Sequence, residues 1–250
     1  MPTEEQFEQA AVAFQRFGLG ARRSGLRTIA SDPQGALLEE LDHPVRARIR
    51  PRGLPDYREA AAIGTRTFFE QQDVFLAENT ARLKRQVSTP IGFLERLVMF
   101  WTSHFSMTVE KKGHIRAMAG QYERDVIRAN LTGNFGQMLR DAILHPAMIC
   151  YLDNTDSIGP NSPAGRFYRS GLNENLGREI LELHTVGAGA GYTEADVGSM
   201  AAILSGHSYV RGWECDNGFE PERLRGQYMF RETWHEPGQH RVLGFQPANN

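Results

Sequence analysis

Apolar positions in the first two-thirds of the chain recur at the spacing of an α-helix. The first case runs from Phe7 to Phe14, with apolar residues at i, i+3, i+4 and i+7, and Gly18 follows where such a helix would end. Asp32-Pro33 pairs an N-capping residue with a proline at the first helical position, so we expect a second helix to about Leu41. The start of the chain is therefore predicted to be helical.

The same periodicity continues beyond a connector at 43–55, which is rich in proline and arginine and has no period of its own. The segment 94–105 is the most apolar of the later helices and is expected to form core. Residues 153–171 are rich in turn-forming residues and predict a long loop, a feature that is often functional. The periodic segments predict helices at about 56–87, 94–105, 114–130, 134–145, 173–186 and 194–205.

The pattern changes after Gly206. Short runs that favour β-strands occur at 208–210, 228–230 and 241–243, and turn signals lie between them. The fold class predicted from these patterns is mainly α: a bundle-like, multi-helix domain at 1–206 with a small antiparallel β appendage at 207–250.

Composition removes several function classes. The 250 residues carry a net charge of −2, which gives no general attraction to nucleic acid or to a membrane surface. No apolar run approaches the roughly 20 residues that span a bilayer, and the N-terminal segment lacks the pattern of a signal peptide, so a cytoplasmic location is the default expectation. Cys150 and Cys215 stand far apart and form no zinc, haem or disulfide pattern.

The segment 173–185 carries the most distinctive chemistry. On a helix, Leu172, Leu176, Ile180 and Leu183 form an apolar stripe, and a polar stripe lies beside it. Glu179 and Glu182 are spaced i, i+3 and could share a metal ion or a proton, whereas Arg178 and Glu182 are spaced i, i+4 and could pair. His184 points away from both carboxylates. The alternative is a buried Arg–Glu network that only orders neighbouring helices. The polar stripe consists of Asn175, Arg178, Glu179 and Glu182.

Histidines supply further candidate ligands. His104 lies at the margin of an apolar stripe, where a hydrogen-bonded core histidine is the alternative. His235 and His240 flank a tight turn and could both reach one ion, but two ligands are too few to specify a site, and a solvated turn explains them equally well.

Several motifs follow one another in order over essentially the whole chain. They are Phe14–Ala21, Phe100–Phe105, Gly133–Phe135, Pro146–Asn154, Asn173–Leu183 and His235–Gly244. Together they resemble one bacterial family, known as domain of unknown function 1800 (DUF1800), and the Asn-Glu-Asn helix is highly specific.

The resemblance implies a mostly helical protein. Relatives are often exported, and no substrate or catalytic residue is established for them. The chain departs from the family pattern at Thr102, where relatives often have a second histidine, at His207, where they have tryptophan, and at Glu236, where they have aspartate; position 184 can be phenylalanine in relatives. Because relatives continue beyond this point, the resemblance also implies that a C-terminal part is missing after Asn250.

Two functional hypotheses follow. In the first, the protein is an enzyme, a hydrolase or an oxidoreductase, with Asn175, Arg178 and Glu179 as catalytic residues. A divalent metal, the one cofactor considered, would then be bound by His104, Glu182 and His235. In the second, it is a non-enzymatic binding or assembly protein of the cell envelope with an unknown protein partner. The many ionisable and amide groups beside an apolar stripe favour the enzyme.

Overall fold

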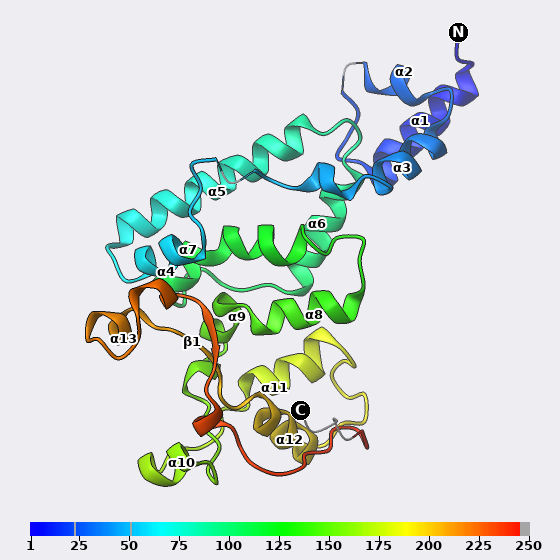
Figure 1. Cartoon of the computed structure of the whole chain (residues 1–250). Helices are drawn as coiled ribbons and strands as arrows, with labels where there is room; N and C mark the ends of the chain where they lie inside the picture. Colours follow the sequence, from blue (N-terminus) through cyan, green and yellow to red (C-terminus); the bar gives the residue numbers. More distant parts are fainter. Residues whose placement is uncertain (23, 51, 246–250) are drawn as a thin grey trace. The chain divides into compact units, whose positions relative to one another are not determined.

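The computed structural model describes residues 1–22, 24–50 and 52–245, and most of them are helical (Figure 1). The segments η2 and η4 are π-helical and the other η segments are 3-10 turns. In chain order the elements are α1 (Glu4–Phe17), α2 (Gly25–Ile29), α3 (Pro33–Leu41), η1 (Pro44–Ala47), α4 (Tyr57–Gly64), α5 (Phe68–Ser88), α6 (Phe93–His104), α7 (Gly113–Tyr122), η2 (Glu123–Ile127), α8 (Phe135–Leu144), α9 (Pro146–Tyr151), η3 (Asn154–Asp156), α10 (Pro163–Tyr168), α11 (Asn175–Glu179), η4 (Ile180–His184), α12 (Glu194–Leu204), β1 (His207–Tyr209), α13 (Gly212–Asp216), η5 (Glu222–Leu224), β2 (Tyr228–Phe230) and η6 (Glu232–Trp234).

The predicted fold class is confirmed. A two-stranded antiparallel sheet near the C-terminal end accompanies the helices, with His207 opposite Phe230 and Tyr209 opposite Tyr228. The run at 241–243 was expected to be a strand, and this is wrong within the described residues. Leu243 has a left-handed backbone (φ 52°), and only an isolated bridge from Val242 forms there. Among the described residues, no helix combines the length and the apolar character that crossing a membrane requires.

The chain divides into two compact units, each described separately below. Residues on both sides of position 206 belong to the second unit, and the predicted domain boundary at 206 stays a prediction. Unit 1 contains Met1–Leu54, Leu76–Ser106 and Glu123–Met138, and unit 2 contains Pro55–Phe75, Met107–Tyr122 and the chain from Leu139 onward.

Unit 1 has an apolar core built by its N-terminal helices. Ala10 and Phe14 of α1 pack with Ile29 of α2 and with Ile91. The Asp32 side chain accepts a hydrogen bond from the Gly35 N–H at 2.8 Å and so caps α3 as predicted. The predicted ends of α1 and α3, at Gly18 and Leu41, are confirmed.

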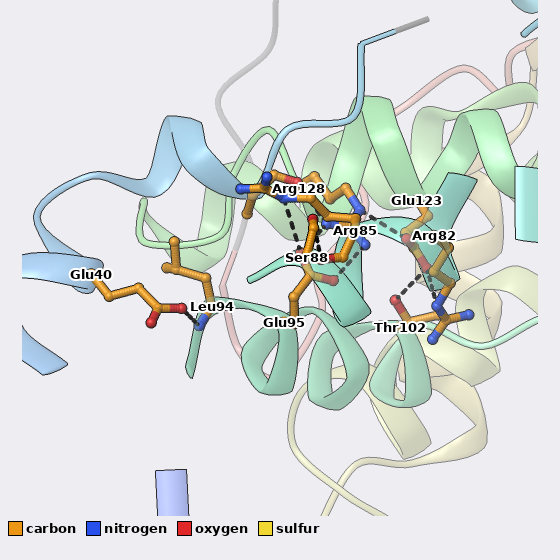
Figure 2. A network of polar contacts seen from close by, with 10 residues as sticks. Glu40, Arg82, Arg85, Ser88, Leu94, Glu95, Thr102, Glu123 and Arg128 are labelled. Atoms are coloured by element: carbon orange, nitrogen blue, oxygen red, sulfur yellow. Dashed lines mark hydrogen bonds and ion pairs between the residues drawn. The ribbon is translucent and has the colours of Figure 1, made fainter. Parts of the chain in front are cut away.

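Unit 1 also contains a buried ion network (Figure 2). The fully buried Arg128 binds Glu95 of α6 in a bidentate pair, with nitrogen–oxygen distances of 2.7 and 2.9 Å. Its Nε donates to Glu123 Oε1 at 2.9 Å, and one terminal nitrogen donates to the Ala47 carbonyl at 2.6 Å. Both carboxylates are themselves buried. The network therefore joins α6, η1 and η2 inside unit 1.

Unit 2 contains two apolar clusters. One joins Ile115 of α7, Ile149 of α9 and Tyr209 of β1. The other joins Leu181 of η4 and Val197 of α12 with Val242. Gly177 allows close packing of α11 on α12, because a Cβ at this position would lie 3.1 Å from the Ala201 nitrogen. The second cluster fixes the helix that carries the predicted site.

The single helix predicted at 56–87 is wrong, because the chain forms α4 and α5 with a break after Gly64. Gln71 explains the break: its side-chain amide donates to the Gly64 and Arg66 carbonyls at 3.2 and 2.9 Å, which replaces helical hydrogen bonds. A Cβ on Gly64 would lie 2.7 Å from the His114 Cα, so α4 packs tightly against α7 at this residue.

Other predicted helices occur with altered geometry. The helices expected at 114–130 and 173–186 begin as α-helix and continue as the π-helical η2 and η4. The loop expected at 153–171 contains the short helix α10. The helices at 134–145 and 194–205 are confirmed as α8 and α12, and 94–105 as α6.

Candidate functional site: a polar pocket along α11 and η4

A pocket of about 360 Å³ in unit 2 runs along α11 and η4. The three residues predicted to be catalytic, Asn175, Arg178 and Glu179, all line it. Glu182, predicted as a metal ligand, lines it as well. The sequence-predicted polar stripe therefore faces one shared cavity. The full lining is Thr108, Lys111, Tyr151, Leu152, Asn175, Arg178, Glu179, Glu182 and Leu183.

The loop before α11 fixes where the helix begins. The Asn173 side chain accepts a hydrogen bond from the Asn175 N–H at 3.0 Å and donates one to the Asp153 carbonyl at 3.4 Å. The Asn173 N–H in turn donates to Ser157 Oγ at 3.0 Å. These bonds join the start of α11 to the 153–157 segment, and Asn175 itself stays exposed at the pocket.

Arg178 is the most heavily paired residue of the site. Its guanidinium binds both oxygens of Glu194, at 3.1 and 2.7 Å, and also contacts Glu182 at 3.2 Å and Glu174 at 3.4 Å. Hydrogen bonds from Glu194 and Glu182 raise the pKa of Arg178 above its ordinary value. These contacts fit the alternative of an Arg–Glu network that orders neighbouring helices, although the Arg178 side chain is 37% exposed rather than buried.

Glu179 and Glu182 have different surroundings. Burial raises the pKa of Glu179 above its ordinary value, and the nearby charge of Glu182 adds to the effect. Glu182 receives hydrogen bonds from Arg178 and from the hydroxyl of Tyr192, whose pKa that bond raises. Glu179 is thereby held toward its neutral form, whereas Glu182 has a cation and a hydroxyl as partners, so the two carboxyl groups have different environments.

The π-helical turn determines which side chains follow these acids. Leu183 was expected in the apolar stripe but is 61% exposed at the pocket rim, whereas Leu181 and His184 are buried. An i→i+5 turn places one extra residue in the helix, so the α-helical phase no longer applies after Ile180. His184 was expected to point away from Glu179 and Glu182, and it is buried whereas those two acids line the pocket.

Lys111 is a pocket residue that sequence reasoning missed. Its ammonium donates to Asp153 Oδ2 at 2.8 Å and lies 5.2 Å from the centre of the Tyr151 ring. Lys112 pairs with the other oxygen of Asp153. Burial raises the pKa of Asp153, but the two ammonium groups outweigh it and hold this pKa below its ordinary value. A signal existed: the chain has only three lysines among 28 basic residues, and two of them are adjacent here.

Of the three predicted metal ligands, Glu182 is a lining residue of the pocket, whereas His104 and His235 have the surroundings described next. His235 Nδ1 is hydrogen-bonded to the Ser205 carbonyl at 2.9 Å, and its ring contacts Phe230. His104 belongs to unit 1, where its ring packs edge-on against Phe105 and Trp101. In the described part of the chain, no three His, Cys, Asp or Glu side chains form a group that could hold a metal ion.

The metal set of His104, Glu182 and His235 is therefore unsupported by the geometry and stays a prediction. The second histidine of the turn, His240, has its Nε2 3.5 Å from the Glu236 carbonyl. Glu236 is buried and binds Asn161 with both carboxylate oxygens. This turn is thus held by its own contacts within unit 2.

Comparison with known proteins gives one result. A search of curated proteins and a search of solved structures both returned no match. The family model described as "Protein of unknown function (DUF1800)" matches residues 12–250, which is nearly the whole chain. The chain therefore belongs to the DUF1800 family.

Proposed function

We propose that the pocket along α11 and η4 is the active site of a carboxylate-dependent hydrolase in which Glu179 is the proton donor. The observation that carries the proposal is the pairing of a carboxyl group of raised pKa, Glu179, with the well-partnered Glu182 on the wall of one cavity. A carboxyl group whose pKa is raised is suited to act as a general acid.

The hydrolysis would use the two acids in complementary roles. Glu182 accepts a proton from the attacking water while the hydroxyl bonds to the electrophilic atom of the substrate. Glu179 gives its proton to the departing oxygen as the scissile bond breaks. Proton exchange with solvent returns both acids to their starting states, so one water is consumed per bond cleaved.

The other pocket groups would position these acids and the substrate. Arg178 is already occupied by three carboxylates, so we assign it to holding Glu182 in place rather than to binding substrate. The exposed amide of Asn175 is available as a hydrogen-bonding group for a polar substrate. A pocket of this size and polarity suits a small, hydrophilic molecule.

The test is a set of chromogenic esters, phosphoesters and glycosides, assayed with the wild type and with Glu179→Gln. Loss of general acid catalysis should reduce the rate by about 100-fold or more. Glu232→Gln, which changes an exposed glutamate elsewhere in unit 2, is the matched control and should leave the rate unchanged. A Glu179→Gln variant as active as the wild type, or no turnover of any class, would contradict the hydrolase.

The non-enzymatic alternative is favoured by one observation. The Arg178 network with Glu174, Glu182 and Glu194 is what a purely structural brace between α11 and the start of α12 would require. Under this alternative the protein would bind a partner at the cell envelope, and Glu179→Gln would leave the rate of every assayed reaction unchanged. The two proposals thus predict opposite outcomes for one variant.

A further inference from the structure

Unit 1 holds a second pocket, separate from the proposed active site, of about 410 Å³. Its apolar wall is formed by Ile29, Ile91 and Leu94, each at most 6% exposed. Arg85 of α5 and Glu95 of α6 supply a charged wall beside the ion network of Figure 2. The pocket therefore combines an apolar interior with a charged side.

Most charges around this pocket are matched by partners within unit 1. Glu95 is bound by Arg128 through both oxygens. The buried Glu40 accepts the Gly92 and Leu94 N–H groups at 3.3 and 3.2 Å, at the N-terminus of α6, where a carboxylate is favourable. Glu39 and Arg46, which also line the pocket, are exposed and pair with each other at 2.7 Å.

Arg85 is the exception. Its Nε is buried and has no hydrogen-bond acceptor among the described residues, and its charged contact is a 3.8 Å approach to Glu95, which Arg128 already occupies. Arg82, one turn earlier on α5, is better satisfied, since its Nε lies 3.3 Å from Glu123. Within the network of Arg82, Arg85, Arg128, Glu95 and Glu123, there is one guanidinium more than there are carboxylates.

We propose that this pocket binds a small monocarboxylate with an apolar body, whose carboxylate pairs with Arg85 and whose hydrocarbon part lies against Ile29, Ile91 and Leu94. A buried guanidinium donor without an acceptor is costly, and a carboxylate is the group that matches its geometry and charge. The apolar wall excludes a fully polar anion as the preferred ligand, because burying Ile and Leu surface against it would gain nothing.

The experiment uses hexanoate as the probe and hexanamide as its neutral counterpart, each titrated into the wild-type protein by calorimetry. Hexanoate should bind with a Kd on the order of 1 mM or tighter, the range open to so small a ligand. Hexanamide should bind at least tenfold more weakly because it lacks the charge. Methyl NMR signals of Ile29, Ile91 and Leu94 should shift on titration.

Arg85→Met should weaken hexanoate binding at least tenfold, and Arg82→Met is the control, since Arg82 has similar exposure on the same helix but does not line the pocket. Equal binding of the acid and the amide by the wild type, no binding of hexanoate, or unchanged binding by Arg85→Met would each overturn the proposal. The comparison of hexanoate with hexanamide uses only the wild-type protein. It therefore tests the proposal even if Arg85→Met does not fold. None of these readouts involves the pocket of unit 2.

Discussion

Arg128 Nε lies 2.9 Å from Glu123 Oε1, although Glu123 begins η2 and Arg128, five positions later, directly follows its end. In an α-helix such residues are rotated by about 140° from each other and point in different directions. The π-helical η2 removes this separation, and the Arg128 N–H donates to the Glu123 carbonyl at 2.9 Å. The extra residue therefore allows one guanidinium to bind Glu123 while its other nitrogens bind Glu95.

Arg128→Met is predicted to destabilise the protein by about 3–5 kcal/mol. The substitution leaves Glu95 and Glu123 buried with a charge that has lost its main partner, which is the costly way to break a buried ion pair. Chemical denaturation measures the difference. Arg46→Met, which removes an exposed pair with Glu39, is the control and should change stability little. A loss below about 1 kcal/mol for Arg128→Met would contradict the assigned role.

Acid should destabilise unit 2 through His145. The Nδ1 of this residue accepts the Ala147 N–H at 3.1 Å and caps α9, and burial lowers the pKa of His145 to about 4. The unfolded chain, with a pKa near 6.5, binds a proton more readily, so stability is lost as the pH falls from about 6.5 to 4. The loss from this residue should reach roughly 3 kcal/mol.

The variant that isolates this effect is His145→Asn, which keeps a capping acceptor but does not titrate. Its stability at neutral pH should be close to that of the wild type, and its loss between pH 6.5 and 4 should be smaller. An exposed histidine, His43, supplies the control as His43→Asn. Identical acid profiles for the wild type and His145→Asn would show that the cap does not titrate in this range.

Glu179→Gln is expected to be at least as stable as the wild type at neutral pH. Because the folded-state pKa of Glu179 is raised, the folded chain holds its proton more tightly than the unfolded chain does. The wild type therefore loses stability as the pH rises from the ordinary value near 4.5 through the raised one, and a neutral amide avoids this loss. Thermal unfolding at pH 4 and pH 7 measures it; a clear drop in Tm for the variant at pH 7 would contradict this expectation.

Glu182→Gln should lower the pKa of Glu179 toward its ordinary value without fully restoring it. The substitution removes the repulsion between the two acids, but burial, the larger cause of the shift, remains. NMR titration of the Glu179 carboxyl carbon in both proteins gives the comparison. An unchanged pKa would mean that the two acids do not interact across the pocket.

Local sequence signals predicted the helical ends well. Asp32 before Pro33 caps α3 as predicted. The same kind of local contact begins α12, where Thr193 and Asp196 form a capping box with the Thr193 N–H 2.8 Å from Asp196 Oδ2. These contacts span only three residues, so the sequence contains all that they require. The polar stripe at 175–182 was also predicted to share one face, and it lines a single pocket.

Features that depend on distant parts of the chain were missed. Nothing local marks the π-helical turn that exposes Leu183, and the break after Gly64 depends on Gln71 and on packing against His114. Lys111 reaches the pocket because Asp153, about 40 positions later, binds its ammonium. Periodicity describes a regular helix and carries no information about such long-range contacts.

The pKa of Glu179, measured by NMR titration of the wild-type protein, tests the proposed active site most directly. The account predicts a value above the ordinary 4.5 of a glutamate side chain, because burial and the charge of Glu182 both raise the pKa of Glu179. A value at or below 4.5 would mean that Glu179 is fully ionised near neutral pH, and it would remove the proton donor on which the proposed hydrolysis depends.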